Sequence, residues 1–430
     1  MPKVVIVGGG WAGTGAAVSA VQAGAEVVVL ERTDMLLGTG LVGGIMRNNG
    51  RFTAAEEAIA MGVGDVFHVI DNTARHRNID FPGHKHATLY EVANMEPEVK
   101  KLLKLKGVDV RLQARVKDVE MDGNKIKAVT TDDGDKIEGD VFIDATGSAG
   151  PYAMCNKYGN GCAMCVLRCH TFGGRISLAA KAGVQEYMGV KPDGTVGAMS
   201  GSCKLLKESL SQDVQDKLNS TGVAVIPVPE HLRKGMEALA KKACQQYALP
   251  EFNDNIVLLD TGHGKLMTTY YPLDRLRQIP GCENARFEDP YSGGIGNSMR
   301  YMAMSPRDNA LQVIGVENLF CGGEKAGPLV GHTEAIVTGA LAGHNAVCHA
   351  VGQDLVVIPE TLAIGDAIAH VNERVKTPEG LGKKYTFSGS VYFERMKEKG
   401  LYSTDIDAIK TRVEEAGMAH IFSQPVVAAK

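Results

Sequence analysis

The sequence has little net charge and no long apolar run. Its 430 residues carry 46 Lys and Arg against 50 Asp and Glu, a formal net charge of −4. Nucleic-acid-binding domains usually carry a basic face, so this balance predicts no nucleic-acid partner. No apolar run approaches the roughly 20 residues that span a bilayer, and the amino terminus lacks the basic segment of a secretory signal. These absences predict a soluble, cytoplasmic protein with no membrane partner.

A disulfide framework is not expected either. The chain has 9 cysteines, an odd number, and no secretory signal accompanies them. Five of them are scattered and are expected to be small buried side chains. No internal repeat or low-complexity segment is present. The length suits two or three domains, each with its own hydrophobic core.

The amino-terminal stretch VVIVGGGWAGTGAA has the pattern of a dinucleotide-binding loop. Gly8, Gly10 and Gly13 stand in G-x-G-x-x-G order between an expected strand, residues 4–7, and an expected helix of small residues. Such glycines allow a tight turn, a close approach to a diphosphate and close packing of helix on strand. Glu31 ends the next apolar run, where a carboxylate accepts hydrogen bonds from ribose hydroxyls. We therefore expect a strand–loop–helix–strand unit that binds a dinucleotide.

Two later segments decide which dinucleotide is expected. DVFIDATGSAG, residues 140–150, resembles the second sequence signature of two-dinucleotide-binding flavoproteins. VENLFCGGEKAGPLVGHTEAIVTGALAG, residues 316–343, is similar to their third signature, in which a glycine turn and a helix N-terminus meet the flavin. The resemblance implies FAD as the cofactor. No second G-x-G-x-x-G with a following helix and acid is present, so a separate NAD domain is not expected.

More narrowly, the chain resembles the FAD-dependent oxidoreductase family that includes heterodisulfide-reductase-A-like flavoproteins. It is more distantly similar to GidA and the folate-dependent tRNA methyltransferase flavoproteins. Carried over onto this sequence, the resemblance places further residues at the cofactor. Near the ribityl chain, diphosphate and flavin ring it implies Gly38, Gly43, Gly44, Ala145, Thr146, Gly147, Gly323, Glu324, Gly331, His332 and Thr333.

The expected fold is α/β. The resemblance implies a glutathione-reductase-like FAD-binding Rossmann domain of the three-layer ββα type, built from residues 1–150 and 308–352. An inserted α+β domain for the cluster and substrate is expected over residues 151–307, because helical and strand-like stretches mix there. Residues 353–430 are expected to form a helical C-terminal extension.

A cluster of four cysteines follows the second signature. In CNKYGNGCAMCVLRC, Cys155, Cys162, Cys165 and Cys169 stand in the pattern C-x6-C-x2-C-x3-C. Short spacings of this kind suit a [4Fe–4S] cluster, since a tight loop can reach several irons. Zinc, a redox-active pair of Cys162 and Cys165, and inert thiols remain alternatives. The position after the second signature predicts a cluster close to the flavin.

We therefore expect an FAD-dependent oxidoreductase in which a [4Fe–4S] cluster next to the flavin couples two-electron chemistry to one-electron transfer. The alternatives are a non-catalytic electron-transfer subunit of a larger redox complex and a thiol-dependent flavoprotein without iron. The candidate catalytic residues are His332 at the flavin-facing helix, His170 beside the cysteines, and Arg300 as an anchor for an anionic substrate. A ferredoxin-like redox partner is expected, and a homo-oligomer is the commonest assembly. The sequence does not name the substrate.

Overall fold

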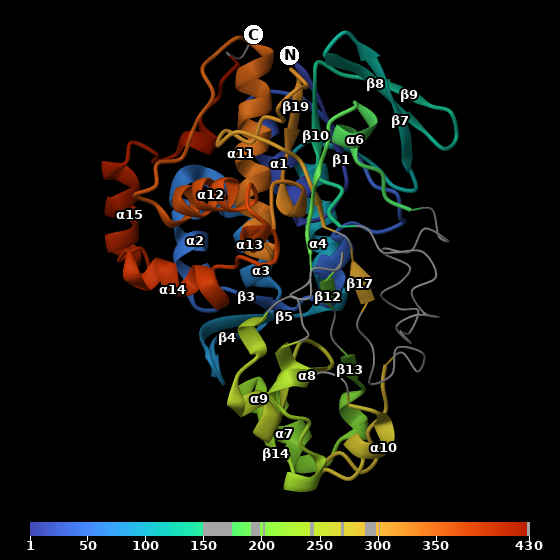
Figure 1. Cartoon of the computed structure of the whole chain (residues 1–430), viewed down its shortest axis with the longest axis vertical. Coiled ribbons are helices and arrows are strands. Elements are labelled where there is room, and N and C mark those ends of the chain that lie inside the picture. The colour runs from blue at the N-terminus through green and yellow to red at the C-terminus, as the bar shows by residue number, and fades with distance from the viewer. Residues whose placement is uncertain are drawn as a thin grey trace.

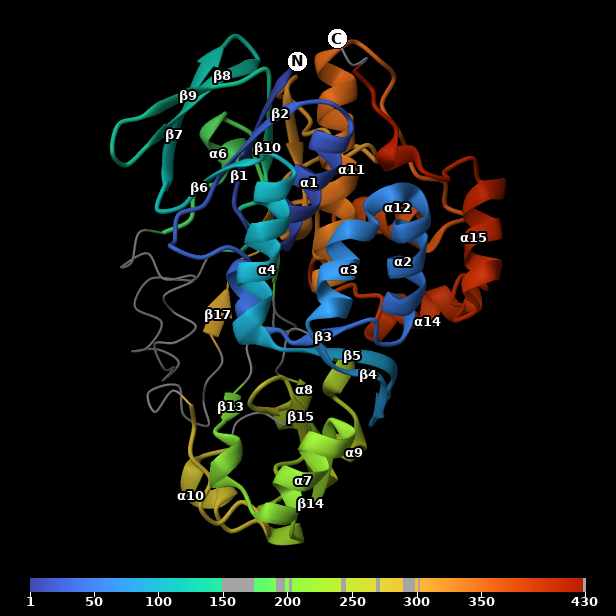
Figure 2. The ribbon, with the colours of Figure 1, turned by 180° about the vertical axis from the view of Figure 1, so that it is seen from behind.

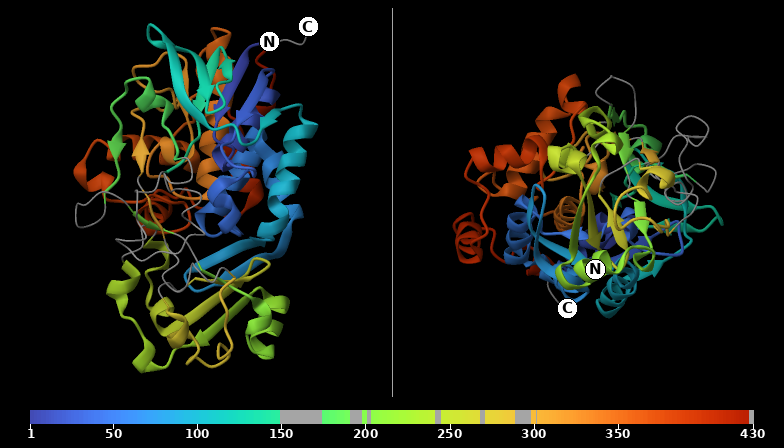
Figure 3. Two further views of the ribbon diagram at one scale, coloured as in Figure 1. Left: turned by 90° about the vertical axis from the view of Figure 1, so that its right-hand side faces the viewer. Right: turned by 90° about the horizontal axis from the view of Figure 1, so that it is seen from below.

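The structure is a computed structural model with an upper and a lower body. It describes residues 1–148, 174–190, 198–200, 203–240, 245–267, 271–288, 298–300 and 302–427. The upper body holds a central sheet and the longest helices, and the smaller lower body lies beneath it (Figure 1). The N-terminus and the last described residues lie at the top of the upper body, far from the lower body (Figure 3). None of the helices in the described ranges has the length and apolar character needed to cross a membrane.

The central sheet of the upper body is parallel and is built from both ends of the chain. Its order is β19-β10-β1-β2-β6, and every neighbouring pair is parallel. The strands are β1 (Lys3–Val7), β2 (Glu26–Leu30), β6 (Asp109–Arg111), β10 (Val141–Asp144) and β19 (Leu319–Cys321). All four residues of β10 are buried, as expected of a strand that is covered on both faces of a parallel sheet. The strand expected at residues 4–7 is confirmed.

Two helices that are far apart in sequence cross in direct backbone contact. They are α1 (Trp11–Gln22) and α11 (His332–Ala350). A Cβ added to Gly339 would lie 2.0 Å from the carbonyl oxygen of Ala12, and one added to Gly343 would lie 2.2 Å from that of Ala16. The small residues that the sequence concentrates in both helices therefore allow this crossing. It fixes the N-terminus of α11 relative to the loop that precedes α1.

Further helices and a small sheet surround the central sheet. The helices α3 (Gly64–Asn72) and α4 (Val92–Leu105) run beside one another, as Figure 2 shows from behind. A π-helical turn over Ile59–Val63 joins α3 to α2 (Gly50–Ala58). An antiparallel meander is formed by β7 (Val116–Asp122), β8 (Lys125–Thr131) and β9 (Lys136–Glu138).

The lower body has its own antiparallel sheet, in the order β13-β16-β15-β14. These strands are β13 (Cys203–Leu205), β14 (Val223–Pro227), β15 (Asn255–Asp260) and β16 (Gly264–Leu266). Helices α7 (Gln212–Thr221), α8 (Met236–Ala240), α9 (Pro250–Asp254) and α10 (Leu273–Leu276) accompany them. A three-stranded sheet of β3 (Ile45–Met46), β4 (Ala74–Phe81) and β5 (His84–Tyr90) lies between the two bodies, and its side chains share an apolar cluster with β15.

The remaining elements are short pairs and the C-terminal helices. Two-residue and three-residue strands pair as β11 (Tyr187–Met188) with β18 (Ala303–Met304) and β12 (Ala198–Ser200) with β17 (Ser298–Arg300). A single turn, α6 (Leu178–Lys181), follows residues 174–177. The expected helical extension contains α12 (Ala363–Arg374), α13 (Pro378–Leu381), α14 (Ser390–Glu398) and α15 (Ile406–Glu415), which pack beside α2 (Figure 1).

The glycine-mediated crossing of α1 and α11 gives the first testable prediction. Gly343→Ala places a Cβ against backbone that cannot move independently, so it should destabilise the fold by about 1–3 kcal/mol. Thermal unfolding should show this as a melting temperature lower by a few degrees. The control is Gly382→Ala, whose Cβ would meet no atom closer than 3.4 Å. Equal melting temperatures for the two variants would contradict the proposed role of the crossing.

Candidate functional site

A cavity of about 310 Å³ lies at the carboxyl ends of the parallel strands. The loops after β1, β2, β10 and β19 meet there, as in other open α/β sheets that bind ligands at this edge. Most of the residues that the sequence assigned to the cofactor line this one cavity. They are Gly8, Gly10, Glu31, Gly38, Gly43, Ala145, Thr146, Gly147, Gly323, Glu324, Gly331 and His332.

Three residues assigned to the cofactor lie behind the cavity wall. A Cβ on Gly13 would lie 1.9 Å from the carbonyl oxygen of Gly8, so Gly13 lets α1 pack against the loop. Gly44 packs against Thr261 of the lower body, which a Cβ would meet at 2.4 Å. Thr333 is fully buried in the first turn of α11. These residues position the wall rather than line it.

Glu31 is held in place by the chain itself. Its Oε2 accepts from the backbone N–H of Gly9 at 2.8 Å. Its Oε1 accepts from the backbone N–H of Thr33 at 2.9 Å and from the Thr33 hydroxyl at 3.1 Å. A carboxylate offers about four acceptor positions, so one remains for a ligand hydroxyl. Glu31 thus joins the loop after β1 to the loop after β2 at the cavity wall.

Asp144 is a fully buried carboxylate at the end of β10. It accepts from the Thr146 hydroxyl at 2.6 Å, the Thr146 N–H at 3.2 Å and the Leu178 N–H at 2.9 Å. The ammonium group of Lys325, itself fully buried, lies 3.7 Å away. Burial alone would raise the pKa of Asp144, but the charge of Lys325 and the bonds from Thr146 outweigh it and the pKa is lowered. The carboxylate therefore stays ionised and joins three chain segments.

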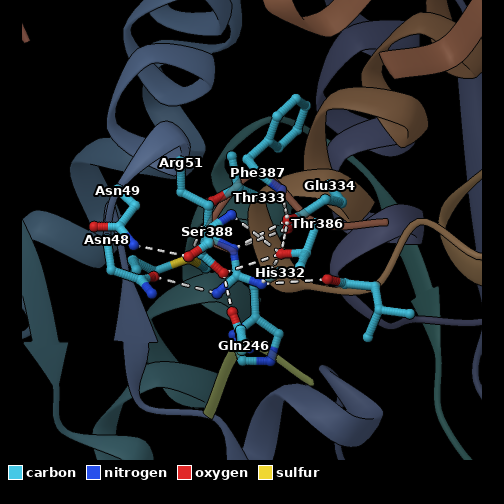
Figure 4. Close-up of polar contacts among 12 residues, drawn as sticks. Asn48, Asn49, Arg51, Gln246, His332, Thr333, Glu334, Thr386, Phe387 and Ser388 are labelled. Atoms are coloured by element: carbon cyan, nitrogen blue, oxygen red, sulfur yellow. Dashed lines mark hydrogen bonds and ion pairs between the residues drawn. The ribbon is translucent and has the colours of Figure 1, made fainter. Parts of the chain in front are cut away.

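A second buried ion pair fixes the N-terminus of α11 (Figure 4). The Nε of Arg51 donates to both carboxylate oxygens of Glu334 at 3.1 Å. Glu334 also accepts from the Thr386 hydroxyl at 2.7 Å and from the Phe387 N–H at 2.8 Å. The guanidinium of Arg51 lines the cavity and further donates to the side-chain oxygen of Asn48. Residues 386–388 of the C-terminal extension thereby hold the part of the cavity wall that contains Arg51 and His332.

His84 is a buried, neutral imidazole in the same network. Its Nδ1 accepts hydrogen bonds from the side-chain amide nitrogens of Asn48, at 2.9 Å, and Asn49, at 3.3 Å. The ring therefore accepts at Nδ1 and donates its Nε2 proton to the carbonyl oxygen of Gln246, 3.3 Å away. Burial is the main cause that lowers the pKa of His84 to about 3.

His332 begins α11 and faces the cavity as a neutral side chain. Burial lowers its pKa to about 3, and the positive charges of Arg51 and Lys265 act in the same direction. Its Nδ1 lies 3.4 Å from the hydroxyl of Tyr90, which donates to the carbonyl oxygen of Gly40 at 3.1 Å. A Cβ on Gly43 would lie 1.7 Å from the imidazole, so the loop and the ring are in direct contact. His332 remains a predicted catalytic residue in a position that suits contact with a ligand.

Sequence reasoning missed a set of residues that also line the cavity. From the lower body they are Gln246, Tyr247, Lys265 and Met267, and from the upper body Trp11, Arg32, Arg51, Arg115 and Arg175. Lys265 donates to the carbonyl oxygen of Val42 at 2.7 Å, which ties the lower body to the glycine-rich loop. Single arginines and lysines carry no spacing pattern, so the sequence offered no signal for them.

Several predicted site residues lie outside the described part of the chain. They are Cys155, Cys162, Cys165, Cys169 and His170. Arg300 ends β17, where its backbone pairs with Ala198 of β12. Among the described residues, no group of three or more His, Cys, Asp and Glu side chains is arranged to hold a metal ion.

Comparison with known proteins supports the flavoprotein assignment. The family model "FAD dependent oxidoreductase" matches residues 3–156, and the model "Glucose inhibited division protein A" matches residues 259–354. The chain is also similar to solved structures of GidA from Aquifex aeolicus. One crystal form gives a TM-score of 0.71 at 16% identity over 99% of this chain and 74% of that chain. A second form gives 0.62 at 15% identity over 96% and 78%.

Two curated relatives match shorter stretches. Both are methylenetetrahydrofolate–tRNA-(uracil-5-)-methyltransferases, TrmFO. The protein from Ruegeria sp. (strain TM1040) is 32% identical over 98 residues, and that from Caulobacter sp. (strain K31) is 29% identical over 145 residues. The matches span 23% and 33% of this chain and only 21% and 29% of those relatives.

The parallel sheet, the glycine loop and the cavity at its carboxyl edge define an FAD-binding protein of the Rossmann type. More particularly, residues 3–156 match the FAD-dependent oxidoreductase family, and over other stretches the chain is similar to GidA and TrmFO.

The cavity wall fits a polar dinucleotide such as FAD. The hydroxyl of Ser148 and the Nε of Arg175 are buried there without a hydrogen-bond partner among the described residues. Buried polar atoms normally have partners, so these atoms suit a ligand with acceptor oxygens. Gly8, Gly10 and Glu31 would hold the diphosphate and ribose, and the residues around His332 would hold the flavin end.

The neutral state of His84 makes the stability of the fold pH-dependent. Its folded pKa of about 3 lies below the ordinary value of 6.5, so the unfolded chain takes up the proton first. The stabilisation is complete above pH 6.5 and is lost as the pH falls towards 3, by about 1.4 kcal/mol per pH unit. His84→Gln cannot take up this proton.

Urea unfolding between about pH 6.5 and pH 4 measures this slope. The His84→Gln variant should show a shallower loss of unfolding free energy with acid than the unsubstituted protein. The exposed residue His231 provides the control, because His231→Gln should leave the slope unchanged. Identical slopes for His84→Gln and the unsubstituted protein would contradict the assignment.

Proposed function

We propose that this protein is an FAD-dependent oxidoreductase that also carries one [4Fe–4S] cluster. Cys155, Cys162, Cys165 and Cys169 would ligate the cluster, as their spacing predicts. Bound together, FAD and the cluster would supply the coupling of two-electron chemistry to one-electron transfer.

The observation that supports this proposal is where the cysteine segment, residues 149–173, leaves and rejoins the described chain. Ser148 precedes it and Gly174 follows it, and both line the FAD cavity. The cysteine segment therefore begins and ends at this cavity, which supports a cluster that would serve the cofactor bound there.

The rejoining end of this segment is firmly attached to the FAD-binding sheet. The Nε of Arg115 donates to the carbonyl oxygen of Gly174 at 2.8 Å. Asp144 accepts from the Leu178 N–H and lies 3.4 Å from the Ser177 hydroxyl. These contacts hold one end of the cysteine segment at a fixed place beside the second signature. Such anchoring is what a relay between two redox groups requires.

The part of the cavity around His332 and Arg51 has groups that would orient a substrate without changing their own charge at physiological pH. His332 stays neutral at physiological pH and can exchange hydrogen bonds without gaining charge. Arg51 is held by Glu334, and its positive charge favours an electron-rich ligand nearby. Gln246, Tyr247 and Met267 close this end from the lower body. A small substrate would bind between these lower-body residues and the side chains of His332 and Arg51.

The same features suggest a redox partner for the protein and two competing functions. A ferredoxin-like protein is the proposed redox partner, and the charge balance of −4 favours no nucleic acid. The protein would then act as a homo-oligomer or alone on a small molecule. A non-catalytic electron-transfer subunit and a thiol-based flavoprotein that uses Cys162 and Cys165 are the competing functions. The tRNA methylation named for TrmFO is not carried over, because the matches span at most 29% of those relatives.

The cluster proposal predicts the metal content of cysteine variants. Protein purified without oxygen should contain about four irons and four acid-labile sulfides per FAD. Replacing Cys162 or Cys165 with Ser should remove most of the iron and leave the flavin bound, because the flavin is held by other residues. Iron and sulfide analysis with a flavin spectrum of each sample measures this.

The matched control is Cys282→Ala, a buried thiol in the core of the lower body. It should keep both iron and flavin. If the unsubstituted protein contained flavin but no iron, the proposed cluster would be ruled out. Zinc analysis and thiol titration before and after reduction would then separate a zinc site from a redox dithiol.

A further inference from the structure

Arg175 has hydrogen-bonding capacity that the described chain does not use. It is the second residue after the cysteine segment and lines the FAD cavity. A guanidinium carries five N–H donors. Among the described residues its one hydrogen-bond partner is the Thr146 hydroxyl, 3.1 Å from Nη1, and its Nε is buried with no partner. Leaving buried charged donors unsatisfied is costly.

Two other arginines in the cavity wall, Arg115 and Arg51, are committed to protein groups. Arg115 donates to both carboxylate oxygens of Asp132, at 2.7 and 2.9 Å, and to the carbonyl oxygen of Gly174. Arg51 pairs with Glu334 at 3.1 Å. Arg175 makes no ion pair with any described residue, although it sits in the same wall. Its donors are therefore available to a ligand in the cavity.

The charges around this end of the cavity also favour an anion. Burial lowers the pKa of Arg175, while the negative charges of Asp144, Glu186 and Glu324 oppose this effect without direct contact. Burial likewise lowers the pKa of Arg32, and the positive charges of Arg115 and Arg175 add to the effect. Arg115 and Arg175 thus repel the guanidinium of Arg32 while Glu31 attracts it, and a bound anion would add a further counter-charge at this wall.

We propose that Arg175 binds the diphosphate of FAD. This inference rests on the proposed FAD site and adds a residue that lies outside the three flavoprotein signatures. The diphosphate is the one anionic part of FAD, and the planar fork of a guanidinium matches phosphate oxygens with paired hydrogen bonds. Arg175 would thereby attach the residues next to the cysteine segment to the cofactor itself.

The test compares FAD with riboflavin, which has the flavin ring and no phosphate. Arg175→Gln should weaken FAD binding by about 10- to 100-fold, the range for a lost hydrogen bond to a charged group. Riboflavin binding should stay the same. Arg175→Lys, which keeps the charge and loses the fork, should give a smaller loss for FAD. Quenching of flavin fluorescence on titration with the apoprotein of the full chain measures both affinities.

The matched control is Arg111→Gln, an exposed arginine at the end of β6 that pairs with Asp109. It should bind FAD as the unsubstituted protein does. Equal FAD affinities for Arg175→Gln and the unsubstituted protein would overturn the proposal, and so would equal losses for FAD and riboflavin, which indicate a structural role. If Arg175→Gln does not fold, the same comparison with Arg175→Lys decides. An unsubstituted protein that binds no FAD would instead contradict the proposed function.

Discussion

The buried carboxylate of Asp144 is the constraint on which the site depends. It ends β10 in the middle of the parallel sheet and accepts from Thr146, Ser177 and Leu178. It also faces the buried ammonium of Lys325, which follows β19. One ionised group thus joins the second signature, the third signature and the chain after the cysteine segment. Lys325 also pairs with Glu186, so replacing Lys325 would leave two buried carboxylates without the cation they share, which is strongly destabilising.

The sequence was informative where function depends on local backbone geometry. The spacing of Gly8, Gly10 and Gly13 and the position of Glu31 predicted a loop, a helix and a carboxylate that the structure brings to one cavity. The sheet order was less accessible, because β19 joins the sheet beside β10 from almost 180 residues away in sequence. Contacts such as that of Arg51 with Glu334 form only when distant segments meet, so no spacing in the sequence predicts them. The cysteine spacing predicted a cluster, and that prediction falls on residues outside the described ranges.

The flavin side of the cavity depends on both bodies of the protein. The loop over residues 42–44 lies between His332 of α11 and Thr261 with Lys265 of the lower body. Residues 386–388 brace the same region through Glu334. This part of the cavity wall is therefore assembled from three parts of the chain that are separated in sequence. This explains why the family resemblance, which rests on the FAD-binding signatures, does not identify the substrate.

The most direct measurement of the central claim is the number of electrons that the purified protein accepts per flavin. An anaerobic titration with dithionite, followed by visible absorption, gives this number. Our account predicts about three electrons per FAD, since the flavin takes up two and a [4Fe–4S] cluster takes up one. An end point at about two electrons, with the spectrum of flavin alone, would contradict it.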